Sequence, residues 1–192
     1  MFDNLRADID RWRQEEIRDG WWRRYRWTET IRYLVNVGMA PVIVYRFEHW
    51  VFKRVRIPIV RQVLIVFGMV IRRFVGMWTG VVIAPQAEIG PGLEIHTFYG
   101  VFIGITKIGK NFTVGTGVLV NCGARGIGDN VYMGPGAKII GEVKVGNNVV
   151  IMANSLVLTD VPDNTTIAGV PARIKLRGGR PRHAMGRGAF RS

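Results

Sequence analysis

A six-residue period between Ile83 and Val157 is the feature that most constrains what this chain can fold into. An aliphatic residue leads each six, with one residue inserted before Ile108 and one before Ile127. Twelve of the thirteen leading residues are Ile or Val, and glycine follows the leader six times, at 90, 109, 115, 128, 134 and 146. The leaders are Ile83, Ile89, Ile95, Val101, Ile108, Val114, Val120, Ile127, Met133, Ile139, Val145, Ile151 and Val157.

This period predicts a solenoid of parallel β-strands. Each six residues are expected to form one short strand and one turn, so three units return the chain to its starting face. The β-branched leaders would stack into a continuous core, and the glycines permit turn conformations that a Cβ resists. The segment from Ile83 to Pro162 has room for roughly four coils of such a parallel β-helix.

Charge divides the chain into three regions. Residues 1–80 carry a net charge of +7 and all six tryptophans, residues 81–174 are neutral, and residues 175–192 add +6 with no acid. We therefore expect a helical, basic and aromatic head over 1–80, the β-helix domain over 81–174 and a flexible basic tail over 175–192. The single cysteine allows no disulfide within the chain.

The head is expected to be helical and to lie on an anionic membrane surface. Leu5, Ile9 and Trp12 fall at helical spacing, a second helix is predicted over 28–39, and an apolar run follows Pro58. Its longest uncharged stretch, 62–71, is too short to span a bilayer, but Trp and Arg beside apolar faces suit a bilayer interface. Packing of these faces on each other or on other subunits is the alternative. Nucleic acid is not expected as a partner, since such apolar runs would contribute little to binding it.

Two groups of segments carry a resemblance to a known family. The end of the repeat, 153–162 and 168–174, resembles the closing segment of the serine acetyltransferase branch of the hexapeptide-repeat acyltransferases. The segments 88–96 and 107–111 look like the relatives of that branch in bacterial polysaccharide gene clusters. The resemblance implies a left-handed parallel β-helix and a homotrimer with active sites in clefts between the β-helices. It also implies that acetyl-CoA is the co-substrate and that a histidine takes the proton of the acceptor hydroxyl.

His96 is the candidate catalytic base, because it is the single histidine of residues 81–174. Aligned without a gap, however, it falls one position before the catalytic histidine of the family, and Thr97 occupies that position. A bulge at this turn would let His96 face the cleft; otherwise it lies on the outer surface and the site is degenerate. The second histidine of the family has no counterpart in the short segment 120–126.

The resemblance also assigns residues to the co-substrate. Gly134, Ala153, Arg173 and Lys175 are the positions expected to meet acetyl-CoA, the two cations through its phosphates. The alternative for the two cations is a solvated basic end of the β-helix. No metal is expected. Cys122 is expected to be a buried small residue rather than a nucleophile.

These expectations combine into one leading function. The chain would transfer acetyl from acetyl-CoA to a sugar hydroxyl of a polysaccharide or a lipid-linked glycan precursor. Because residues 1–16 do not look like a signal peptide, we expect a cytoplasmic protein on the inner face of the cell membrane. The alternatives are a catalytically inactive scaffold or regulator at the membrane, favoured by the missing histidines, and a serine O-acetyltransferase. Since the acidic partner and the second histidine of that enzyme are missing, serine is the less expected acceptor.

Overall fold

Three helices precede a solenoid of short strands in the computed structural model, which describes residues 2–18, 39–96 and 99–177. The helices are α1 (Phe2–Arg18), α3 (Met39–Arg54) and α4 (Pro58–Thr79). Proline is tolerated in the first turn of a helix, and both α3 and α4 carry one there. The helix expected over 28–39 lies outside the described residues up to position 38, and Met39 opens α3 instead.

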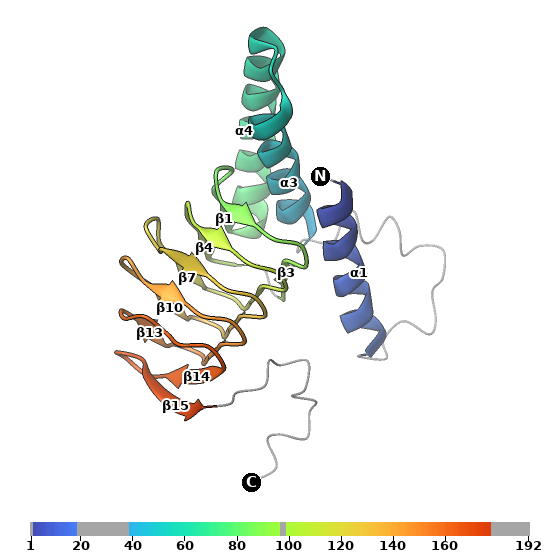
Figure 1. Ribbon diagram of the computed structural model, residues 1–192. Helices are drawn as coiled ribbons and strands as arrows, with labels where there is room; N and C mark the ends of the chain where they lie inside the picture. Colours follow the sequence, from blue (N-terminus) through green and yellow to red (C-terminus); the bar gives the residue numbers. More distant parts are fainter. Residues whose placement is uncertain (1, 19–38, 97–98, 178–192) are drawn as a thin grey trace.

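The solenoid consists of fifteen strands, most of them two or three residues long (Figure 1). They are β1 (Val81–Ile83), β2 (Glu88–Ile89), β3 (Glu94–Ile95), β4 (Val101–Ile103), β5 (Lys107–Ile108), β6 (Thr113–Val114), β7 (Leu119–Val120), β8 (Gly126–Ile127), β9 (Tyr132–Met133), β10 (Lys138–Ile139), β11 (Lys144–Val145), β12 (Val150–Ile151), β13 (Leu156–Val157), β14 (Thr165–Ala168) and β15 (Arg173–Arg177).

The strands form three sheets that run the length of the solenoid. Up to β13, every third strand belongs to the same sheet: the first has the order β1-β4-β7-β10-β13, the second β2-β5-β8-β11, and the third β3-β6-β9-β12-β14-β15. All pairings are parallel except that of β14 with β15, which folds back to close the end. The expected left-handed β-helix of roughly four coils is confirmed, with a closing turn through β13 and β14 after the fourth coil.

The repeat builds the core as the period predicted. All thirteen leading residues are buried, each at most 4% exposed. One assignment of register was wrong: Ile103, rather than Val101, stacks between Ile83 and Val120. Val101 instead stacks on Val81, two residues earlier on the paired strands. Val101 and Ile103 are both buried, because strand β4 has two inward positions. The extra residues of this part of the repeat therefore lie between Ile95 and Ile103.

The helices cap the first coil, whose outer backbone edge has no preceding coil to pair with. Tyr45 on α3 donates to the carbonyl of Ala87 at 2.8 Å and accepts from the amide of Ile89 at 3.2 Å. Helix α4 packs antiparallel to α3, and the pair rises beyond the first coil (Figure 1). Within the described part of the chain, no helix is both long enough and apolar enough to cross a bilayer.

Candidate functional site

His96 lies at the end of the first coil beside an acidic side chain. Its Nε2 atom is 3.4 Å from Oε1 of Glu94, two residues earlier on β3. Since side chains alternate along a strand, a spacing of two places both on the same face. The Glu94 side chain is only 3% exposed, whereas that of His96 is 34% exposed. The Glu94 carboxylate is therefore buried, whereas solvent can reach the His96 ring.

Helix α1 covers the Glu94 carboxylate on its other side. The Nε atom of Arg11 is 3.4 Å from Oε2 of Glu94, and Arg11 Nη2 donates to Oγ1 of Thr113 at 2.7 Å. Arg11 also donates through Nη1 to the carbonyl of Gly92. Each oxygen of the Glu94 carboxylate thus faces a different residue: Oε2 faces Arg11 and Oε1 faces His96.

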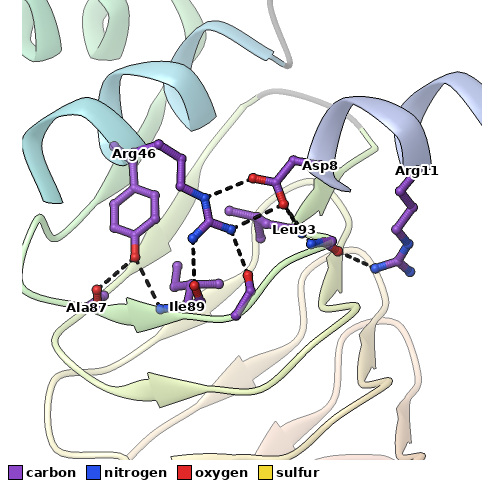
Figure 2. A network of polar contacts seen from close by, with 9 residues as sticks. Asp8, Arg11, Arg46, Ala87, Ile89 and Leu93 are labelled. Atoms are coloured by element: carbon purple, nitrogen blue, oxygen red, sulfur yellow. Dashed lines mark hydrogen bonds and ion pairs between the residues drawn. The ribbon is translucent and has the colours of Figure 1, made fainter. Parts of the chain in front are cut away.

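A buried polar network holds α1 on the first coil (Figure 2). Asp8 is fully buried and accepts hydrogen bonds from the amides of Gly92 and Leu93 at 2.7 and 2.8 Å. It also pairs with Arg46 of α3, whose Nε lies 2.9 Å from Oδ2 of Asp8. Arg46 in turn donates to the carbonyls of residues 89 and 90 at 2.6 and 2.7 Å. The buried charges are therefore paired and hydrogen-bonded, as burial requires.

His96 stands at the head of one edge of the solenoid. Its amide donates to the carbonyl of Val114, and the amide of Gly134, two coils further, donates to that of Ile151. Positions 96, 115 and 134 are therefore equivalent, about 5 Å apart from coil to coil. A Cβ at Gly134 would lie 2.7 Å from the backbone nitrogen of Ala153, so only glycine fits there. The predicted residues Gly134 and Ala153 meet, on the edge that begins with His96.

The two predicted cations lie on the closing strand. Arg173 and Lys175 are both exposed on β15, and Ala172 before them donates its amide to the carbonyl of Leu156. Arg173 also lines an open pocket of about 350 Å³ at the last coil, together with Asp160 and apolar residues. Gly134, Ala153 and Lys175 do not line this pocket. The acetyl-CoA roles of all four residues remain predictions.

The remaining polar candidates do not form a second site. Cys122 is exposed and accepts from the amide of Ile105 at 3.4 Å, so the expectation of a buried residue was wrong. The cause is its place at a corner of the coil, outside the ladder of inward positions. Across the described ranges, no three His, Cys, Asp or Glu side chains gather as a metal ion would require. Thr97 lies outside the described residues.

The sequence alone did not point to four residues of this site: Glu94, Arg11, Asp8 and Arg46. Only Glu94 carried a signal, because an acid two residues before a histidine on a strand shares its face. The backbone amides that Asp8 binds are more than eighty residues away in the chain, so no local pattern could reveal them.

Comparisons with known proteins agree with this fold. The model of the bacterial transferase hexapeptide family (six repeats) matches residues 126–159. A serine acetyltransferase of Synechococcus elongatus is 33% identical over 150 residues, which cover 74% of this chain and 58% of that protein. One of Staphylococcus epidermidis is 43% identical over 113 residues, covering 54% and 52%. The chain thus spans about half the length of these curated relatives.

Solved structures extend the similarity to most of the chain. The crystal structure of serine acetyltransferase from Brucella abortus has a TM-score of 0.72 at 30% identity, over 93% of this chain and 69% of that one. A serine acetyltransferase in complex with CoA gives 0.71 at 29% identity, over 90% and 68%.

The expectation of a sugar hydroxyl as acceptor, and with it a place in polysaccharide biosynthesis, is corrected by these findings. Relatives and structural neighbours alike are named serine acetyltransferases. The segments 88–96 and 107–111 that suggested a glycan acceptor lie in the first and second coils. The chain belongs to the bacterial hexapeptide-repeat transferases, in their serine acetyltransferase-like branch.

Proposed function

We propose that this chain is an acetyl-CoA-dependent O-acetyltransferase whose acceptor is the hydroxyl of serine, with His96 as the general base. The observation that carries the proposal is the contact of His96 Nε2 with the buried Glu94 carboxylate, 3.4 Å away, on an exposed edge of the β-helix. The relatives named serine acetyltransferases support the acceptor.

The pair supplies what the reaction needs. A carboxylate facing Nε2 favours the tautomer with its proton on that atom, which makes Nδ1 the proton-accepting nitrogen of the ring. As the serine Oγ attacks the thioester carbonyl, Nδ1 of His96 takes the hydroxyl proton. When the C–S bond breaks, the imidazolium returns that proton to the departing thiolate, so the products are O-acetylserine and CoA. The negative charge of Glu94 stabilises the imidazolium between the two steps.

Acetyl-CoA supplies the activated acetyl group. The edge below His96 leaves room for a long ligand over the second and third coils, where glycines at 115 and 134 carry no side chain; the exposed Met152 takes the equivalent position of the fourth coil, beside Ala153. Arg173 and Lys175 offer two exposed cations for the phosphates. We include in the proposal the homotrimer implied by the family resemblance, in which this edge faces a neighbouring β-helix.

Release of CoA thiol in the presence of L-serine tests the proposal. We expect the wild type to release CoA with serine but not with glucose or another sugar, and His96→Gln to lower kcat by at least about a hundredfold. His49→Gln is the matched control, because His49 lies on α3 with Nδ1 3.1 Å from the carbonyl of Pro85, away from the edge. Full activity of His96→Gln would overturn the assignment of the base. Absence of acetyl-CoA binding in a calorimetric titration up to millimolar concentration would overturn the transferase and leave the scaffold.

We also propose that α4 contacts an anionic membrane surface. Its outward face carries large exposed side chains at helical spacing, among them Ile59, Val63, Phe67 and Phe74, at 56–77% exposure. From residue 49 to residue 87 the chain contains six Lys or Arg and no Asp or Glu. Two of these cations, Lys53 and Arg72, are paired with Glu88 and Glu48. Packing this face against copies of itself would bring the remaining cations together, whereas anionic headgroups neutralise them.

Sedimentation with vesicles tests this contact. We expect binding to phosphatidylglycerol-containing vesicles and little to pure phosphatidylcholine, with Phe67→Ser/Phe74→Ser weakening it about tenfold or more. Phe102→Ser, on the half-exposed outer face of β4, is the control. If the α4 substitutions change the oligomeric state and leave vesicle binding unchanged, the face packs between subunits.

A further inference from the structure

We propose that Arg11 is a positioning residue for His96: the guanidinium on α1 holds the Glu94 carboxylate, and Glu94 holds the imidazole. The inference deepens the proposed function and rests on it where it makes His96 the base. It adds that α1 is part of the candidate site, although this helix lies outside the β-helix and Arg11 precedes His96 by more than eighty residues.

The first step is that the two oxygens of the Glu94 carboxylate have different partners. Oε2 faces Arg11 Nε at 3.4 Å and lies 3.4 Å from Oγ1 of Thr113, while Oε1 faces His96 at 3.4 Å. A glutamate has rotatable bonds that let its carboxylate turn. With one oxygen held by Arg11 and Thr113, the other is directed to His96.

The second step is the fixed position of Arg11 itself. Its guanidinium donates to Thr113 at 2.7 Å and to the carbonyl of Gly92, so it is tied to both the first and the second coil. One turn of helix earlier, Asp8 accepts from the amides of Gly92 and Leu93. Residues three positions apart share a helix face, so the Asp8 anchor and Arg11 reach the first coil together.

The third step is charge. Glu94 on β3 faces His96 directly, and Arg11 on α1 faces the other oxygen of the same carboxylate. The carboxylate favours the protonated imidazole, and the guanidinium beyond it weakens that effect. Removing the positive charge of Arg11 should therefore raise the pKa of His96, and removing the negative charge of Glu94 should lower it. A loss of folding would not produce opposite signs.

Proton NMR of the three histidines in the full chain tests the coupling without requiring activity. His96→Gln identifies the His96 signal. We expect Arg11→Gln to raise the pKa of His96 by roughly half a unit to one unit and Glu94→Gln to lower it by a similar amount. In the Glu94→Gln background the Arg11 substitution should have little effect, since the group through which it acts is gone.

Lys53→Gln is the matched control. Lys53 likewise joins a helix to the first coil through an ion pair, with Nζ 2.8 Å from Glu88, but does not contact Glu94. We expect it to leave the pKa of His96 within about 0.2 unit, because exposed charges are screened by salt. A Lys53 effect as large as that of Arg11, or the same sign of shift for Arg11→Gln and Glu94→Gln, would overturn the inference.

Kinetics separate this inference from the proposed function. If serine is acetylated, Arg11→Gln should lower kcat about tenfold with a change of less than about twofold in the KM for acetyl-CoA, and Arg11→Lys should restore part of the loss. If the wild type is inactive while the NMR shifts appear, the proposed function fails and the coupling stands. If the wild type is active and the shifts are absent, the coupling fails and the proposed function stands.

Discussion

Asp8 and Arg46 form a buried ion pair, 2.9 Å from Oδ2 to Nε, that joins two helices above the open edge of the first coil (Figure 2). Each partner also bonds to backbone groups of that coil: Asp8 to amides and Arg46 to carbonyls. In a β-helix the internal coils satisfy one another, so only the terminal coils leave such groups unpaired. The pair therefore acts as the cap of the solenoid.

Asp8→Asn should destabilise the protein strongly. The substitution leaves the Arg46 guanidinium buried without its counter-charge, which costs about 3–5 kcal/mol when one partner of a buried pair is removed. At fixed protein concentration, we expect the melting temperature to fall by about 10 °C. Asp10→Asn, two residues along α1 at an exposed position, should change it by less than about 2 °C. Equal effects from the two variants would show that the pair is not what holds α1.

Tyr45 should make stability depend on alkaline pH. Burial raises the pKa of its phenol from 10.0 to about 12, against the opposing charge of Arg46. Between these values the unfolded chain loses the proton and the folded chain keeps it, so stability falls as pH rises from 10 to 12, by about 2–3 kcal/mol in all. Denaturant unfolding across this range measures the loss. Tyr45→Phe should be less stable at neutral pH by about 1–3 kcal/mol, because the amide of Ile89 loses its acceptor, and should lack this part of the pH dependence. A wild-type curve parallel to that of Tyr45→Phe would contradict the assignment.

The sequence predicted the solenoid because its core repeats at short range: leaders of successive coils stack on one another, as Ile89 does on Ile108 and Ile108 on Ile127. The same period could not show that Ile103 takes the stacking position instead of Val101, since both are aliphatic and both are buried. That choice depends on how many residues separate Ile95 from the next stacking position, which the period does not constrain.

The site was predicted less completely, for a different physical reason. His96 was found because it is chemically conspicuous within the repeat. Arg11 was not, since it is one of many basic residues in the head and its role comes from tertiary packing of α1 on the first coil. The predicted acceptor was wrong because a fold determines where a ligand binds but not which ligand it is.

Four asparagines at one corner of successive coils should contribute measurably to stability. Asn111, Asn130, Asn148 and Asn164 all have φ near +56°, and the Nδ2 of each of the first three donates to the Oδ1 of the next at 2.9–3.0 Å. Asparagine tolerates this left-handed conformation better than most residues. Asn130→Ala should cost about 2–3 kcal/mol, since it loses two hydrogen bonds and strains the backbone.

Asn130→Gly separates the two causes. Glycine adopts positive φ freely, so it should recover about 1 kcal/mol of the loss caused by alanine, although it also lacks the side-chain bonds. Lys110→Ala, at an exposed position on the neighbouring coil, is the control and should change stability by less than about 0.5 kcal/mol. Urea unfolding measures all three. A glycine variant no better than alanine would show that the hydrogen bonds alone matter.

Arg173 and Lys175 should hold the phosphates of acetyl-CoA at the end of the edge that begins with His96. We expect Arg173→Gln/Lys175→Gln to raise the Kd for CoA about tenfold, because two charge-assisted contacts are lost, and to reduce the salt dependence of binding. Lys138→Gln/Lys144→Gln removes the same charge from exposed positions on the other two sheets, and should change the Kd by less than about twofold. Calorimetric titration at two salt concentrations measures both. Equal weakening in the two double variants would mean that net charge attracts CoA, and an unchanged Kd in the first would place the phosphates elsewhere on the solenoid.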